Sequence, residues 1–147
     1  MAKKFSELRA KSRLEGLEPN VHMEVTPRQQ LRARYPAILA HASLCFGDGW
    51  IGIMEALCER LQFHADHNAM LPVEITQAKE KYGELSVLYS GGNDYAAALV
   101  DMAEAMSLHV CEICGKPGKS NDGLGVKIVR TRCPECGSLP HTLDSLP

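Results

Sequence analysis

The sequence predicts an α+β fold, in which helices surround a small antiparallel sheet and a zinc-ribbon or treble-clef-like module follows at the C-terminal end. Apolar residues recur at helical spacing over residues 51–61 and 95–106, which predicts two core helices. Between them, two short apolar runs at 73–78 and 85–89 predict the strands of a hairpin. Two Cys-x-x-Cys pairs follow the second helix and predict the metal-binding module.

The length and composition favour one compact unit with a small appendage. The chain has 147 residues, of which 45% are hydrophobic, enough to supply a real core. We expect a charged N-terminal arm or helix over 1–20, an α+β core over 21–108, and a zinc-binding module over 109–147 packed on the core. No apolar run approaches the ~18 residues of a spanning helix, and the start lacks a signal peptide's apolar region. We therefore expect a cytoplasmic protein without membrane association.

Capping residues indicate where the helices begin. Thr26 precedes a proline and, three residues on, a glutamine, which is the pattern of a capping box. That first helix is expected to kink or restart at Pro36. Asp48 lies in a Gly-Asp-Gly-Trp turn and can cap the main core helix, and Asn93 or Asp94 can cap the last helix.

Several apolar and sulfur-containing side chains are candidates for the core. Trp50, the only tryptophan, is interpreted as a core anchor rather than a ligand platform. Cys58 shares a helical face with apolar residues, so it is expected as a buried thiol rather than a nucleophile, and Cys45 is also expected as a free thiol in apolar surroundings. One face of the last helix is marked by Tyr95, Leu99, Met102 and Met106.

The two cysteine pairs have the form of zinc knuckles. Each places two thiols on a tight turn followed by a glycine, and 18 residues separate Cys114 from Cys133. The spacing predicts one structural zinc ion held by Cys111, Cys114, Cys133 and Cys136. Four thiolates leave no open coordination position for water or substrate, so the metal is expected to fold the module rather than to catalyse.

Four histidines offer alternative ligands. His109 and His141 flank the cysteines, and either could replace a cysteine ligand, although we expect them to be solvated or hydrogen-bonded near the site. His64 and His67 form a polar cluster that is interpreted as the end of the main helix, where histidines favour the negative end of the helix dipole. The alternative is a metal-dependent nuclease that uses these two histidines.

The charge distribution bears on the class of partner. Lys and Arg number 8 against 4 acidic residues over 1–34, 3 against 10 over 35–110, and 5 against 4 over 111–147. The acidic middle repels phosphate, so a nucleic-acid partner would have to use the N-terminal arm together with Lys127, Arg130 and Arg132. Four thiolates and one zinc ion add two negative charges to the last segment, which weakens the nucleic-acid hypothesis further.

Three stretches carry a resemblance to a known group of proteins. They are Gly47-Asp48-Gly49-Trp50, residues 77–85 around Lys79-Glu80-Lys81-Tyr82-Gly83, and residues 103–118, which contain Cys111-Glu112-Ile113-Cys114-Gly115. The pattern resembles small phage and prophage proteins of uncharacterised function and covers about 46–137 of the chain. These relatives often end the second knuckle with a single cysteine and a nearby histidine, whereas this chain has Cys133 and Cys136. The resemblance implies a mobile-element origin and no known enzyme activity.

These observations favour a non-enzymatic, zinc-stabilised protein that binds another protein. Small phage proteins commonly bind one host protein, so by analogy a host protein is the expected partner. A phosphate-binding glycine loop, a nucleophile elbow and a paired acid-base arrangement are all lacking in the sequence. Nucleic-acid binding is the alternative hypothesis, and the histidine-dependent nuclease is the third.

Overall fold

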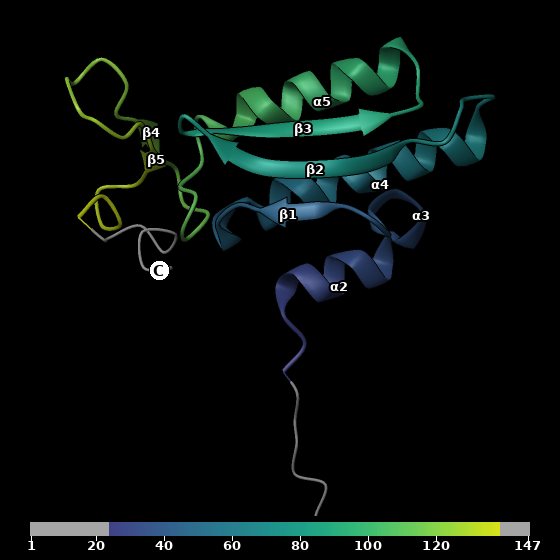
Figure 1. The fold of residues 1–147 in the computed structure, drawn as a ribbon, viewed down its shortest axis with the longest axis horizontal. Coiled ribbons are helices and arrows are strands. Elements are labelled where there is room, and N and C mark those ends of the chain that lie inside the picture. Colours follow the sequence, from purple (N-terminus) through teal and green to yellow (C-terminus); the bar gives the residue numbers. More distant parts are fainter. Residues whose placement is uncertain (1–23, 139–147) are drawn as a thin grey trace, which may run out of the picture.

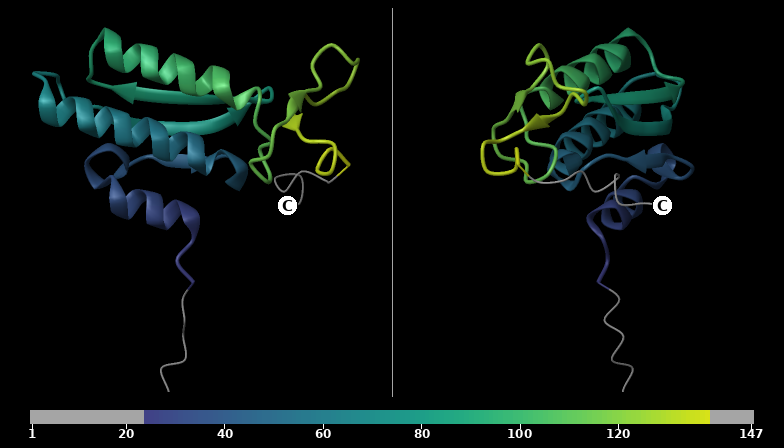
Figure 2. Two further views of the ribbon diagram at one scale, coloured as in Figure 1. Left: turned by 180° about the vertical axis from the view of Figure 1, so that it is seen from behind. Right: turned by 60° about the vertical axis from the view of Figure 1, so that its left-hand side comes forward.

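The computed structural model describes residues 24–138, and the predicted N-terminal arm over 1–20 lies outside them. A three-stranded sheet and two long helices form the core (Figure 1). The strands are β1 (Ser43–Cys45), β2 (Glu74–Lys81) and β3 (Glu84–Ser90), in that spatial order. The helices α4 (Ile51–His67) and α5 (Asp94–Ser107) pack side by side on one face of the sheet (Figures 1 and 2). The α+β class is confirmed.

The sheet is mixed, so the prediction of a purely antiparallel sheet was wrong. Strands β2 and β3 are antiparallel, but β1 runs parallel to β2, with Leu44 opposite Ala78. The physical reason is the connection, since the chain passes through α4 between β1 and β2 and a helical crossover returns it in the same direction. With only three residues, β1 is too short to show a sequence period.

The predicted hairpin is confirmed, with strands longer than the sequence indicated. The charged segment that we expected to connect the strands is itself paired, with Lys79 opposite Ser86 and Lys81 opposite Glu84. Only Tyr82 and Gly83 form the turn, with φ angles of 53° and 79°, as two-residue hairpin turns require. The buried face of the hairpin is formed by Ile75, Ala78, Leu85 and Val87.

Two short helices lie beside β1. Thr26 caps α2 (Pro27–Arg34) with a complete capping box, and α3 (Pro36–Leu39) starts at the predicted proline. The side chains of Arg28 and Arg32 donate to the carbonyl oxygens of Phe46 and Ala42, which flank β1. These bonds satisfy backbone acceptors next to the edge strand and hold α2 against the sheet.

Trp50 ends the short helix η1 (Asp48–Trp50), where α4 begins, and is the anchor that the sequence predicted. Its side chain is 0% exposed, and its indole nitrogen donates to the carbonyl of Val110, 2.8 Å away. The prediction that Asp48 caps the helix was wrong, because no side chain caps η1 or α4 and the Asp48 carboxylate pairs with Arg28 instead.

The predicted apolar face of α5 is confirmed only for Leu99, which is partly buried and packs against the core. Tyr95, Met102 and Met106 are exposed at 41%, 60% and 47%. The buried positions are occupied by small residues and one valine, namely Ala96, Val100, Ala103 and Ser107. Because α5 packs on both β3 and α4, small side chains allow the close approach, and the three largest apolar side chains named above stay exposed. The predicted cap is confirmed, since the Asn93 side chain accepts a hydrogen bond from the amide of Ala96.

The C-terminal module lies at one end of the sheet, beside the β2–β3 turn (Figures 1 and 2). Its two short strands, β4 (Lys119–Ser120) and β5 (Thr131–Arg132), pair in antiparallel fashion, and an isolated bridge joins Val110 to Pro117. Across residues 24–138, no helix has both the length and the apolar character needed to cross a membrane.

Candidate metal centre

The four predicted cysteine ligands come together in the module. Their sulfur atoms all lie within 4.8 Å of one another, and the Cys114 and Cys133 sulfurs are 3.6 Å apart. A tetrahedral ion with metal–sulfur bonds of ~2.3 Å separates its ligand sulfurs by about 3.8 Å. All six cysteines of the chain are free rather than disulfide-bonded. The cluster can therefore hold a metal ion with little rearrangement.

Backbone hydrogen bonds shape the first knuckle. The amide of Gly115 donates to the carbonyl of Cys111 at 3.0 Å, and the amide of Cys111 donates to the carbonyl of Lys116 at 2.8 Å. Gly115 has a φ of 76°, which a glycine adopts without strain. The expectation of unusual backbone angles after each pair holds for Gly115 only, because Gly137 does not have a positive φ.

Two thiols of the cluster, those of Cys111 and Cys136, have pKa values shifted in opposite directions. Burial raises the pKa of the Cys111 thiol, but backbone hydrogen bonds from Cys114, Cys133 and Ile113 outweigh burial and bring that pKa down to about 6. Burial and the neighbouring thiols, led by Cys133, raise the pKa of Cys136 to about 12. The Cys111 thiol therefore ionises more readily than the Cys136 thiol, and a bound cation favours the thiolate form of both.

The candidate histidines within residues 24–138, His64, His67 and His109, do not join this group. His109 is exposed and His141 lies outside the described residues. His64 and His67 lie at the opposite end of α4 from the module, and their rings stack on Tyr95 and Phe63 at centroid distances of 4.2 and 4.1 Å. Across residues 24–138, the four cysteines are the one group of three or more His, Cys, Asp or Glu side chains placed to share an ion.

The glycine-rich turn before α4, over residues 47–49, packs against the first knuckle and attaches it to the core. The amide of Gly49 donates to the carbonyl of Glu112 at 2.9 Å. A Cβ atom on Gly49 would lie 2.0 Å from the carbonyl oxygen of Cys111, and one on Gly47 would lie 2.0 Å from that of Glu112. Backbone therefore packs on backbone here, and only glycine leaves enough space.

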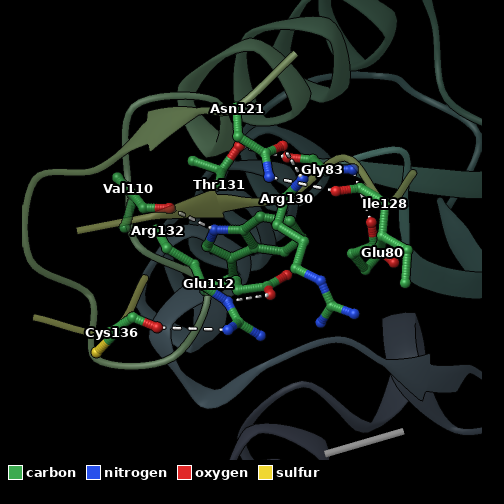
Figure 3. A network of polar contacts seen from close by, with 11 residues as sticks. Glu80, Gly83, Val110, Glu112, Asn121, Ile128, Arg130, Thr131, Arg132 and Cys136 are labelled. Carbon is green, nitrogen blue, oxygen red and sulfur yellow. Dashed lines mark hydrogen bonds and ion pairs between the residues drawn. The ribbon is translucent and has the colours of Figure 1, made fainter. Parts of the chain in front are cut away.

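The turn between β2 and β3 attaches the second half of the module to the core. The hydroxyl of Thr131, a fully buried residue, donates to the carbonyl of Gly83 at 2.7 Å (Figure 3). The carbonyl of Thr131 in turn accepts from the amide of Glu112 at 3.1 Å. Two segments of the module that lie far apart in the sequence are thereby joined to each other and to the core.

A buried ion pair connects the two knuckles. The Arg132 Nε lies 3.2 Å from a carboxylate oxygen of Glu112, and the two side chains are 7% and 5% exposed. Arg132 also donates to the carbonyl of Cys136 at 3.3 Å (Figure 3). Burial raises the pKa of the Glu112 carboxyl, and the hydrogen bond from Arg132 opposes that rise. Sequence reasoning missed this pair, because cysteine spacing contains no signal for it.

The Glu112–Arg132 ion pair removes one residue from the basic surface that a nucleic-acid partner was expected to use. Lys127 is exposed. Arg132, however, turns inward to Glu112 and Cys136 and does not extend a basic patch across the module.

The two cysteines outside the cluster differ in exposure. Cys58 is fully buried, as predicted, and burial raises the pKa of its thiol to about 12. Cys45 is exposed at the edge of the sheet, so the expectation of apolar surroundings was wrong for this residue.

In the native protein, iodoacetamide at pH 8 should alkylate Cys45 much faster than Cys58, because alkylation requires an accessible thiolate. Peptide mass spectrometry measures both, and equal native rates would contradict the assigned burial. In denaturant the two rates should converge.

A comparison of the chain with protein-family models, with curated proteins and with solved structures finds no match. The geometry of the centre is therefore the basis for its assignment.

Proposed function

We propose that this chain is a non-enzymatic protein-binding module whose C-terminal part is held together by one structural zinc ion. The observation that carries the proposal is the convergence of four cysteine sulfurs within 4.8 Å. Tetrahedral thiolate sites favour zinc, and four protein ligands leave no open position for a reacting water. The ion links the two knuckles and supports a zinc-ribbon-like module, because so small an apolar cluster could not order this segment alone.

Exposed apolar side chains at the outer end of the molecule support a protein partner. Tyr82 in the hairpin turn is 79% exposed, and in the loop over 121–130 Leu124, Val126 and Ile128 are 75%, 45% and 51% exposed. Turn and loop adjoin, because Gly83 packs against Val129. We call these four exposed side chains the apolar tip. Exposed apolar residues on adjoining segments are candidates for a protein interaction site.

The resemblance to phage and prophage proteins extends the proposal to the class of partner. A phage-encoded protein acts in the host cytoplasm, where thiols stay reduced and available to zinc. The partner is then a host protein, and the apolar tip is the surface that contacts it.

The test is an affinity pull-down from nuclease-treated host lysate, repeated at low and high salt. One stoichiometric protein should be retained at both salt concentrations, because an apolar contact is little screened. The Leu124→Ser/Ile128→Ser double variant should lose that protein. Leu71→Ser should retain it, since Leu71 is equally exposed, at 71%, but belongs to the loop before β2 rather than to the tip.

Two other experimental outcomes would favour a different class of function for this protein. In a parallel pull-down from lysate without nuclease, retention of nucleic acid and of no protein, abolished by Lys127→Glu and by salt, would favour nucleic-acid binding. Nicking of a plasmid that depends on His64 and His67 would favour a nuclease.

A further inference from the structure

A cleft lies where the core meets the cysteine module. Its volume is about 420 Å³, within the range of ligand-binding pockets. Residues from α2, from the segment joining β1 to η1, from β2 and from the module all line it. The apolar part of its wall includes Leu44, Phe46 and Ile113, and the charged part includes Arg28, Asp48 and Glu80.

The two arginines of the cleft are engaged by the protein itself. Arg28 donates to the Asp48 carboxylate and to the carbonyl of Phe46. Arg132 donates to Glu112 and to the carbonyl of Cys136. An anionic ligand would have to displace a carboxylate from one of these arginines, so the cleft is poorly suited to anions.

Two carboxylates of the cleft retain acceptor capacity. One oxygen of Asp48 accepts from Arg28 at 2.5 Å, and one oxygen of Glu80 accepts from the amide of Gly83 at 2.6 Å. Within residues 24–138, no donor contacts the second oxygen of either group. Three carboxylates, with Glu112 the third, and two guanidinium groups line the cleft, and the positive charge of Arg130 also acts on Glu112.

We propose that the cleft binds an arginine side chain of the partner protein, an inference that rests on the proposed protein-binding function. The alkyl stem of an arginine packs on apolar surface such as that of Phe46, while its planar head offers several donors to the open oxygens of Asp48 and Glu80. Charge-assisted hydrogen bonds of this kind are stronger than neutral ones. An apolar residue next to the arginine would contact Leu44 and Ile113.

The test uses the full-length, zinc-loaded protein labelled with ¹⁵N and titrated with Nα-acetyl-leucyl-arginine amide. Saturable shifts should appear at the amides of Gly47, Asp48, Glu80 and Ile113. The matched peptide with citrulline in place of arginine has the same shape without the charge, and it should bind at least about tenfold more weakly. Equal affinity for the two peptides, or shifts confined to other surfaces, would overturn the proposal.

A pair of double variants separates the cleft from overall charge. Asp48→Asn/Glu80→Gln should lower the affinity for the arginine peptide at least about tenfold, while the amide oxygens keep the bonds to Arg28 and Gly83. Glu59→Gln/Asp101→Asn changes net charge equally at two exposed sites outside the cleft, and it should bind like the wild type. An equal loss in both double variants would overturn the proposal.

The pull-down distinguishes failure of this inference from failure of the proposed function. The Asp48→Asn/Glu80→Gln variant should retain less of the partner than the wild type does. Undiminished retention by this variant would overturn the cleft assignment and leave the protein-binding function intact. If the wild type itself retains no protein, the proposed function fails first and the inference fails with it.

Discussion

Replacement of Cys114 by serine is expected to lower the zinc content well below one ion per chain and to destabilise the protein by several kcal/mol. A serine hydroxyl does not replace a thiolate as a zinc ligand, and structural zinc sites supply folding free energy of about 10 kcal/mol. Cys114 is the exposed member of the cluster, so the substitution leaves no cavity in the core that could account for the loss. Metal analysis gives the stoichiometry, and denaturant unfolding gives the free energy change.

Cys45→Ser is the matched control for this experiment. Cys45 is also exposed but lies outside the cluster, so its substitution should leave zinc content and unfolding midpoint unchanged. A chelator added to the wild type should reproduce the Cys114→Ser effect by making residues 111–138 sensitive to protease while the helices of the core partly survive. Full zinc occupancy with unchanged melting in Cys114→Ser would refute the metal assignment.

Replacement of Gly49 by alanine should detach the first knuckle from the core and cost about 3 kcal/mol or more. The added Cβ would lie 2.0 Å from the Cys111 carbonyl oxygen and 2.7 Å from the Gly115 amide nitrogen, which are backbone atoms with little freedom to move. The hydrogen bond from Gly49 to Glu112 would break as the segments separate. Denaturant unfolding of the zinc-loaded protein measures the loss.

Gly52→Ala is the matched control, because the same methyl group is added three residues later. A Cβ on Gly52 meets no atom within 4 Å apart from the backbone of its own helix, and the residue is the second of α4. There alanine should stabilise the protein by about 0.5–1 kcal/mol, since it restricts the unfolded chain and favours the helix. Equal effects of the two substitutions would show that Gly49 does not form the close contact described above.

Three stretches of the chain, over 47–50, 77–85 and 103–118, meet at one junction. Gly49 packs on the first knuckle, and Gly83 accepts a hydrogen bond from Thr131. Ser107, at the end of α5, accepts from the amide of Leu85 at 2.8 Å, beside the hairpin turn. These stretches therefore have a shared structural role, which is to attach the module to the core.

The sequence by itself determined the features that depend on near neighbours in the chain. Thr26 and Asn93 cap their helices by accepting hydrogen bonds from backbone amides three residues further along the chain. Trp50 follows a turn whose glycines can be identified directly in the sequence. The hairpin and the two cysteine knuckles are likewise local, because each knuckle is a turn of a few residues. The grouping of all four cysteines followed from pairing two such turns around one ion.

Only the tertiary structure decided features that depend on contacts between distant segments. Pairing of β1 with β2 requires α4 to return the chain, and the buried face of α5 depends on how closely β3 and α4 approach it. The Glu112–Arg132 ion pair and the cleft beside it arise where the module docks on the core. Hydrophobic periodicity identifies the apolar face of a helix, but it does not show how closely neighbouring elements approach that face. Packing decides which side chains are small enough to be buried and which charges face inward.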